Sequence, residues 1–312
     1  MQEVFNKYIN YLEAERNASR YTVRNYTHDL LDFFSFIKSK KISSLNEVDR
    51  HVVRDYLSHL MKQGIVKASI ARKLSSIRSF YRYLLREEMV STSPVALTSS
   101  PKLDKRLPSF LTPEETIKLL EAPDLSTPQG QRDQAIMELL YASGLRVSEL
   151  VSLDLGQVNL DTDEIRVWGK GAKERMVLMG KPAAMALSAY LSQGRPKLLG
   201  EKKTSALFVS RYGKRLVERR VQRILEKYTR VAGISKRVHP HTLRHTFATH
   251  LLDGGADLRV VQELLGHANL SSTQIYTHVT KSRARKVYLS AHPLAQEKDS
   301  TYPTTQEKNN KQ

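Results

Sequence analysis

The sequence predicts a mainly α-helical protein of two domains, the second of which carries a small antiparallel sheet. Two observations support this prediction. Most of the chain up to residue 292 repeats apolar residues at the spacing of one helical face, and only short segments of the second half alternate like strands. In addition, 312 residues amount to about two domains of roughly 150 residues each. That length can form a core without disulfides or a structural metal.

The composition excludes several classes of protein. Hydrophobic residues make up 40% and charged residues 26%, so the chain as a whole is not disordered. No apolar run approaches the roughly 18 residues that a membrane span needs. The first residues carry acids and aromatics where a signal peptide needs a basic flank. Cysteine is absent, which excludes disulfides, thiolate zinc sites and cysteine nucleophiles. We therefore expect a soluble, cytoplasmic protein without a membrane partner.

The charge is strongly basic in both halves. Lys and Arg total 50 against 32 Asp and Glu, which gives a formal net charge of +18. Residues 1–106 hold 19 basic and 11 acidic side chains, and the remainder holds 31 and 21. A basic tail would concentrate this excess at one end of the chain. The even distribution favours a polyanion that touches both halves and binds through its phosphates. The alternative is a merely soluble basic surface.

Residues 1–90 are predicted to form four helices. Apolar residues recur at i, i+3, i+4 and i+7 in the first of them, two further apolar patterns follow, and Ser19 is placed to cap the second helix. The third pattern stops at Gly64. The apolar positions are Phe5, Tyr8, Ile9 and Leu12, then Leu30, Leu31, Phe34 and Ile37, then Val48, Val52, Tyr56, Leu57 and Leu60.

The fourth predicted helix, over 67–88, combines an apolar stripe with a basic side. The stripe consists of Ile70, Leu74, Ile77, Tyr81 and Leu84. The basic side consists of Lys67, Arg72, Lys73, Arg78, Arg82 and Arg86. This arrangement predicts that Lys67, Arg72, Lys73, Arg78 and Arg82 contact DNA. A solvated charged face is the alternative interpretation.

The chain is predicted to divide at a linker over 91–108, which is rich in Pro, Ser, Thr and basic residues. The predicted domains are therefore 1–90 and 109–292. The second domain opens on a helix whose start is marked by Thr112, Pro113 and Glu115 as a capping box. Residues 293–312 are polar and unpatterned, and we predict a disordered tail.

The second domain is predicted to be helical except for one hairpin. Residues 164–168 and 175–179 alternate like strands, and the glycines of 169–173 suit a tight turn between them. Residues 207–209 could add a short third strand.

Several residues of the second domain could take part in chemistry. They are Arg146 with Glu149, Lys170 in the predicted turn, His241 with Arg244, His267, and Tyr276. Tyr288 is an alternative to Tyr276. Taken singly, each has a simpler interpretation: Arg146 and Glu149 could form a structural ion pair. His241 and His245 have the spacing of a zinc helix, but Thr242 stands where its acid belongs, so we expect no metal.

Together these residues suit phosphoryl transfer. Catalysis of that reaction consists mostly of positioning and electrostatic stabilisation. Two arginines can hold a phosphate through their planar, permanently charged groups. A tyrosine becomes a nucleophile when its proton is removed or its phenolate is stabilised. A lysine on a turn can protonate the leaving oxygen.

The motifs resemble those of the tyrosine recombinases of the phage integrase family, and within it the Xer subfamily, XerC branch. The resemblance spans nearly the whole chain and rests on five segments, which are Gly144-Leu-Arg146-x-Ser148-Glu149, Gly169-Lys170-Gly171-x-Lys173-x-Arg175, His241-x-Leu243-Arg244-His245, Leu265-Gly266-His267 and Tyr276-Thr277-His278. All six catalytic positions of the family are filled, by Arg146, Lys170, His241, Arg244, His267 and Tyr276. We predict further DNA contacts for Lys173 and Arg175, and a supporting role for Glu149.

The resemblance implies a fold, a mechanism and partners. The two domains would form a C-shaped clamp round DNA, and Tyr276 would make a 3′-phosphotyrosine intermediate. Arg146, Arg244 and His267 would bind the phosphate, Lys170 would act as general acid, and His241 would accept the proton of Tyr276. No cofactor or metal would be needed.

The same resemblance implies a biological role. The enzyme would act as a tetramer on a specific DNA site, as a heterotetramer with a second Xer recombinase. It would resolve chromosome dimers near the replication terminus, under a septal DNA translocase. Alternatives are the integrase of a mobile element, a type IB topoisomerase, a metal-dependent nuclease or transposase, and a non-catalytic DNA-binding regulator.

Overall fold

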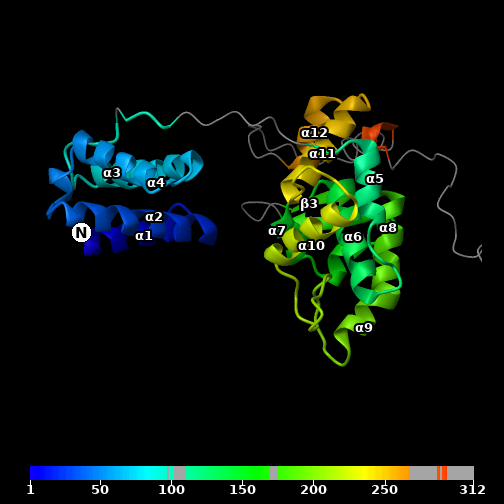
Figure 1. Cartoon of the computed structure of the whole chain (residues 1–312). Coiled ribbons are helices and arrows are strands. Elements are labelled where there is room, and N and C mark those ends of the chain that lie inside the picture. Colours follow the sequence, from blue (N-terminus) through cyan, green and yellow to red (C-terminus); the bar gives the residue numbers. More distant parts are fainter. Residues whose placement is uncertain (97, 102–109, 169–173, 267–286, 289, 294–312) are drawn as a thin grey trace, which may run out of the picture. The chain divides into compact units, whose positions relative to one another are not determined.

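The computed structural model describes residues 1–96, 98–101, 110–168, 174–266, 287–288 and 290–293. The chain divides into two compact units, Met1–Arg106 and Leu107–Gln312 (Figure 1). The boundary between them falls inside the segment 91–108. Among the described residues, no helix has the length and apolar character to cross a bilayer.

The first unit consists of four helices, as the sequence predicts. The Ser19 hydroxyl accepts a hydrogen bond of 3.1 Å from the backbone N–H of Thr22, so this residue caps the second helix as predicted. A short 3₁₀ turn, η1 (Leu45–Glu47), precedes the third helix. The four helices are α1 (Gln2–Ala14), α2 (Arg20–Ser39), α3 (Arg50–Lys62) and α4 (Lys67–Arg86).

The core of the first unit is built against α4. All five residues of its predicted apolar stripe are buried, together with aromatic rings from α1 and α2. Val95 also packs into this core, although it lies in the predicted linker. Residues 98–100 are held as well, because the Arg78 guanidinium donates to the Thr98 carbonyl and, over 2.9 Å, to the Ser100 hydroxyl. The first unit therefore extends further along the chain than residue 90.

The second unit packs most of its helices round α6. Twelve of the 16 residues of α6 are buried, and helices α5, α7, α8, α9, α10 and α11 contact it (Figure 1). The predicted capping box at Thr112 and Glu115 is present, with hydrogen bonds of 3.2 and 2.8 Å. The helices are α5 (Pro113–Glu121), α6 (Pro128–Ser143), α7 (Val147–Ser152), η2 (Leu155–Gln157), α8 (Gly180–Ala189), η3 (Tyr190–Gly194), α9 (Arg195–Leu199), α10 (Glu218–Val231), α11 (Pro240–Asp253) and α12 (Leu258–Leu265).

The predicted hairpin is confirmed as β2 (Glu164–Trp168) and β3 (Glu174–Leu178), paired antiparallel with Ile165 opposite Val177. The third strand was predicted at the wrong place. It is β1 (Val158–Asn159), which pairs with β2. Residues 207–209 are all buried in the main core, so they do not alternate between a buried and an exposed side. Val209 forms an isolated β-bridge with Arg215 and no strand. The predicted class, mainly helical with a small antiparallel sheet, is confirmed. The predicted clamp shape stays a prediction.

A smaller core lies between α11, α12 and the last described residues. The ring of Tyr288 stacks on that of His292, with centroids 5.0 Å apart, and both rings face Phe247 of α11. Burial raises the pKa of Tyr288 and lowers the pKa of His292 to about 3. Both side chains are therefore uncharged near neutral pH, as a buried apolar cluster requires.

Candidate active site

Arg146 is positioned by the tight turn between α6 and α7. Helix α6 ends at Gly144, whose φ of +57° is left-handed, and Arg146 then caps α7. A Cβ on Gly144 would lie 2.6 Å from the Phe247 ring, so the turn also needs the absence of a side chain. The backbone N–H of Arg146 donates to Glu149 Oε2 over 2.9 Å, which satisfies this N–H at the start of α7. The sequence from Gly144 to Glu149 thus fixes this arginine locally.

Glu149 is a buried carboxylate that accepts four hydrogen bonds. Two come from Arg146, through its backbone N–H and through Nη1 at 3.0 Å. The other two come from Arg175 of β3, whose Nη1 and Nη2 donate to the two oxygens over 2.9 and 2.8 Å. Burial raises the pKa of Glu149, but the hydrogen bonds and charges of the two arginines outweigh it and hold the pKa below its usual value. The carboxylate is therefore ionised at neutral pH.

Arg244 reaches the same place from α11. Its Nη1 donates to the carbonyl of Gly144, and its Nη2 donates over 2.6 Å to the carbonyl of Leu265 at the end of α12. Arg146 Nη2 donates over 3.3 Å to the next carbonyl, that of Gly266. Burial and the charge of Arg146 lower the pKa of Arg244 to about 10, so Arg244 remains cationic at neutral pH. Two guanidinium groups from distant parts of the sequence therefore converge on adjacent peptide groups.

His241 lies on the first turn of α11, three residues before Arg244, and its side chain is exposed. His239 caps this helix, since its Nδ1 accepts from the backbone N–H of Thr242 over 3.1 Å. Lys170, Lys173, His267 and Tyr276 lie outside the described residues. Gly266, the residue before His267 in the sequence, is described and contacts Arg146 and Arg175.

Comparison with known proteins shows the family to which this chain belongs. Residues 109–283 match the phage integrase family, and residues 5–88 match its N-terminal SAM-like domain. The chain belongs to the phage integrase family. It is 48% identical to tyrosine recombinase XerC of Pelotomaculum thermopropionicum over 92% of this chain and 97% of that protein. It is 43% identical to tyrosine recombinase XerD of Staphylococcus epidermidis, over 95% of this chain and all of that protein.

Solved structures agree with this assignment. XerH site-specific recombinase bound to its difH substrate aligns with a TM-score of 0.67 and 27% identity, over 87% of this chain and 80% of that one. Lambda integrase, residues 75–356, shares the fold with a TM-score of 0.65 at 20% identity, over 88% of this chain and 98% of that one. The predicted Xer-type tyrosine recombinase is thus confirmed, and the chain is an enzyme of site-specific DNA recombination.

Tyr288, the alternative nucleophile, is excluded by its position in this recombinase. Its side chain is 2% exposed, and its hydroxyl lies 2.7 Å from where a Cβ on Gly180 would stand. A phosphodiester cannot reach that oxygen while the core is intact.

The predicted DNA contacts on α4 are only partly available in the recombinase. The ammonium of Lys73 is buried and donates over 2.8 Å to Asp32 on α2, so the prediction for Lys73 is wrong. The guanidinium of Arg72 is bound to the buried Asp29, and that of Arg78 holds residues 98–100. Lys67 and Arg82 have exposed side chains, as a DNA contact requires.

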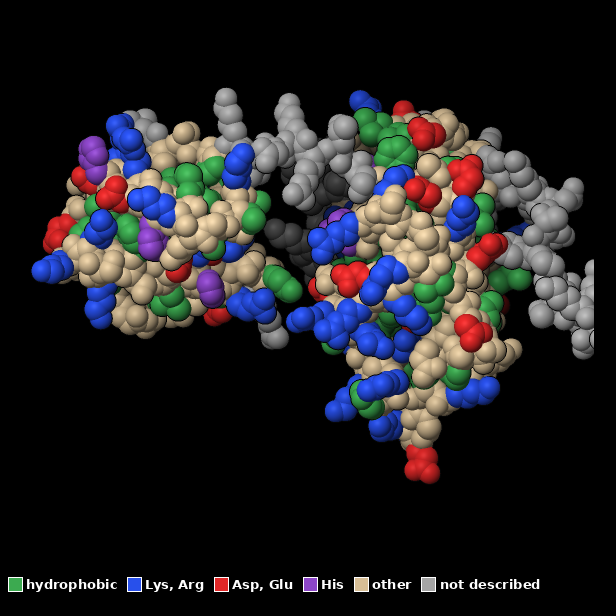
Figure 2. Space-filling view, viewed as in Figure 1, with side chains coloured by type: hydrophobic (Ala, Val, Ile, Leu, Met, Phe, Trp, Pro, Cys, Tyr) green, Lys and Arg blue, Asp and Glu red, His purple; other side chains and the backbone are tan. Residues whose placement is uncertain are grey.

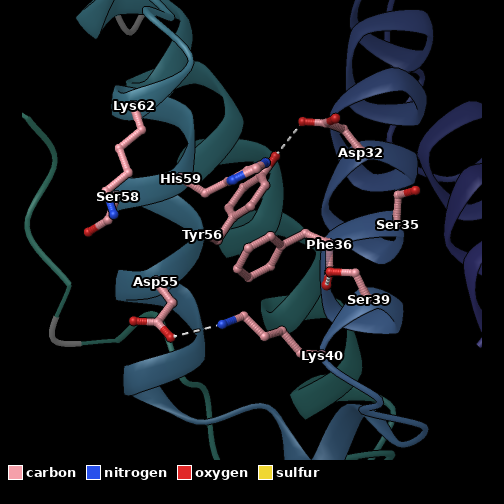
Figure 3. Close-up of a pocket in the computed structure, with 10 residues that line it drawn as sticks. All are labelled: Asp32, Ser35, Phe36, Ser39, Lys40, Asp55, Tyr56, Ser58, His59 and Lys62. Carbon is pink, nitrogen blue, oxygen red and sulfur yellow. Dashed lines mark hydrogen bonds and ion pairs between the residues drawn. The ribbon is translucent and has the colours of Figure 1, made fainter.

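Asp32, the partner of Lys73, also lines a groove of about 650 Å³ between α2 and α3. Figure 3 shows Asp32 at one end of this groove, where the Tyr56 hydroxyl donates to it over 2.7 Å. Asp32 therefore joins α2 to both α3 and α4. The hydrogen bonds from Tyr56 and Lys73 outweigh the burial that raises the pKa of Asp32, so its pKa is lowered and it is ionised at neutral pH. The sequence prediction missed this because Asp32 is 41 residues away from Lys73.

The sequence analysis also missed a basic surface on α10. The inner side of this helix is apolar, and its outer side carries five exposed basic residues, namely Arg219, Arg220, Arg223, Lys227 and Arg230. Figure 2 shows Lys and Arg side chains gathered on this part of the second unit. The signal was present in the sequence, because Val221, Ile224, Leu225 and Tyr228 repeat at helical spacing.

Replacing Gly144 with alanine tests whether the α6–α7 turn positions the arginines. The added Cβ is strained by the positive φ and meets the Phe247 ring, which displaces the carbonyl that Arg244 binds. We expect Gly144→Ala to lower the free energy of unfolding by more than the ~1–2 kcal/mol of a left-handed residue alone, and to slow DNA cleavage about 10²-fold. Thermal unfolding and single-turnover cleavage measure the two effects.

Gly233→Ala is the matched control, because Gly233 has a φ of +67° and no atom within 4 Å of the added Cβ. Gly233→Ala should lower the free energy of unfolding by the cost of a left-handed residue, and it should leave the cleavage rate unchanged. Equal cleavage by the Gly144 and Gly233 variants would contradict the positioning role of the turn.

Proposed function

We propose that this recombinase cuts DNA through attack of Tyr276 on a scissile phosphate held by Arg146 and Arg244. The observation that carries the proposal is the convergence of these two guanidinium groups at the carboxyl end of α12. Each arginine is fixed by backbone carbonyls, so little rearrangement is needed when a phosphate binds. A guanidinium group carries five N–H donors, and the hydrogen bonds of Arg244 within the described residues occupy two of its nitrogens.

The reaction follows from the predicted roles of the six residues. The Tyr276 oxygen forms a bond to phosphorus while the bond from phosphorus to the 5′ oxygen breaks. His241 accepts the phenolic proton, and Lys170 donates a proton to the departing 5′ oxygen. Arg146, Arg244 and His267 stabilise the charge that builds on the nonbridging oxygens. In the second half, a 5′-hydroxyl of the partner strand attacks the 3′-phosphotyrosine and releases Tyr276.

This chemistry needs no metal or cofactor. The number of phosphodiester and phosphotyrosine bonds stays constant, so the bond energy of the backbone is kept for rejoining. The two arginines supply the positive charge that a metal supplies in other phosphoryl transfer enzymes.

The similarity to both XerC and XerD supports a role in resolving chromosome dimers in the cytoplasm. We propose a tetramer on DNA in which a second Xer recombinase supplies two of the four subunits, under a septal DNA translocase. The integrase of a mobile element is the second candidate function, since it would use the same residues. Recombination at a site near the replication terminus, in cells without mobile elements, distinguishes the chromosomal role from this one.

Trapping the covalent intermediate tests the proposed chemistry. A nicked duplex bearing the cognate site loses a short fragment after cleavage, which prevents religation and lets the adduct accumulate. Mass spectrometry of the digested adduct should place the DNA on Tyr276, with the same yield in the presence of EDTA. Tyr276→Phe should bind the duplex and form no adduct. An adduct on Tyr288, or one that disappears in EDTA, would contradict the proposal.

The basic side of α10 is proposed as a DNA-binding surface of the same unit. Neutralising two of its arginines, as Arg220→Gln with Arg223→Gln, should weaken binding of every duplex sequence. Each lost phosphate contact should reduce the slope of log affinity against log salt by about 0.9, so about 1.8 for the pair. A titration of binding against salt concentration measures it. Lys197→Gln, an exposed cation of α9, is the control. An unchanged slope for the α10 variant would refute this assignment.

A further inference from the structure

Arg175 does not have the exposure of a DNA contact, although the sequence analysis predicted one. Its side chain is 10% exposed, and both of its Nη atoms donate to Glu149. Its Nε is buried and has no acceptor among the described residues. Within the part of the chain that the structure describes, the hydrogen bonds of Arg175 therefore all go to one carboxylate. That carboxylate is the one that also binds Arg146.

The charges round Glu149 are unequal. Arg146, Arg175 and Arg244 supply three positive charges and Glu149 supplies one negative charge, which leaves a net charge of +2. Without Arg175, the carboxylate would pair with Arg146 alone, and the net charge would fall to +1. An arginine that is paired with a buried carboxylate attracts a phosphate less, because part of its field is already balanced. The charge of Arg175 thus affects how strongly Arg146 attracts a phosphate.

We propose that Arg175 is a positioning residue of the recombination reaction, which neutralises Glu149 so that the charge of Arg146 remains available to the scissile phosphate. This inference rests on the proposed function of Arg146 as part of the phosphate site. It gives Glu149 a defined task as well. The carboxylate holds two arginines in place, and the second of them cancels its charge.

The position of Arg175 adds a steric role. A Cβ on Gly266 would lie 3.0 Å from Nε and 3.1 Å from Cζ of Arg175, so the turn at the end of α12 rests on this guanidinium. Gly266 has a φ of +64°, and its carbonyl accepts from Arg146. Arg175 therefore lies between two acceptors of Arg146. One is the peptide of Gly266, and the other is the carboxylate of Glu149. It also ties β3, the second strand of the hairpin that carries Lys170, to the phosphate site.

A double-mutant cycle separates the charge role from a merely structural one. Arg175→Met keeps most of the side-chain volume and removes the charge, and we expect single-turnover cleavage of the nicked duplex to slow about 10²-fold. Adding Glu149→Gln removes the charge that Arg175 had balanced. The double variant should therefore cleave at least tenfold faster than Arg175→Met alone. A merely structural role predicts that the second substitution slows cleavage further.

The pH dependence gives a second readout. In Arg175→Met, the buried Glu149 loses a cation, so its pKa should rise towards neutrality. Arg146 and Arg244 are the charged groups that still face it. The rate of this variant relative to the parent enzyme should rise as the pH falls and Glu149 becomes neutral. The double variant should show no such change, because it has no carboxyl group to titrate.

Two further variants act as controls. Arg175→Lys keeps the positive charge and loses the planar guanidinium group that donates to both oxygens of Glu149. Its cleavage rate should remain within about tenfold of the parent rate. Arg166→Met makes the same change on the outer face of β2, where Arg166 pairs with Glu174 at 3.0 Å and is exposed. It should leave cleavage unchanged. Thermal unfolding and DNA binding of each variant show whether it folds.

The proposal is overturned if the double variant is as slow as Arg175→Met or slower, or if the folded Arg175→Lys is as slow as Arg175→Met. Should Arg175→Met fail to fold, the double variant and Arg175→Lys are compared with the parent enzyme, and a loss of more than about tenfold in either folded variant overturns the proposal. An adduct on Tyr276 in the parent enzyme, with no coupling between Arg175 and Glu149, would refute this inference and leave the proposed function intact. No adduct in the parent enzyme would refute the function itself.

Discussion

The candidate site depends on the buried carboxylate of Glu149. Removing a charge from solvent is costly unless hydrogen bonds and opposite charges replace the lost hydration. Glu149 meets this condition by accepting four hydrogen bonds from Arg146 and Arg175. Because the carboxylate has only these partners among the described residues, the two arginines are fixed relative to each other. The start of α7, the strand β3 and the guanidinium group of Arg146 are thereby joined through the side chain of Glu149.

The packing of α6, α11 and α12 places Arg244 beside Arg146. Helix α11 packs against α6, so the left-handed turn after α6 offers its Gly144 carbonyl to Arg244. The end of α12 offers the carbonyls of Leu265 and Gly266 to the two arginines. Carbonyls at a helix end carry a partial negative charge, which suits cations. The like charges of Arg146 and Arg244 can therefore lie close together before any phosphate is present.

The sequence predicted well those features that depend on neighbouring residues. The Ser19 cap, the Thr112 capping box and the hairpin strands follow from local patterns, and the structure confirms them. The motifs also predicted the family, because they fix which residue types occur together in order.

The sequence predicted poorly those features that depend on partners far along the chain. Lys73 looks exposed in a helical projection, yet it pairs with Asp32, which lies 41 residues earlier. Arg175 looks like a basic residue of a hairpin, yet it is buried against Glu149. A helical or alternating pattern shows which side a residue lies on, and it does not show what the tertiary fold places against that side.

In the proposed mechanism, the positive charge of the arginines acts on the negative charge of the scissile phosphate. It is tested most directly by changing both partners. Single-turnover cleavage is measured for the parent enzyme and Arg244→Ala on a normal duplex, and on one whose scissile phosphate is replaced by a neutral methylphosphonate. We expect Arg244→Ala to slow cleavage by about 10³–10⁵ on the phosphate, and by less than about tenfold on the methylphosphonate, where a neutral methyl group replaces one of the two nonbridging oxygens. An equal loss on both substrates, in a variant that folds and binds DNA normally, would contradict it.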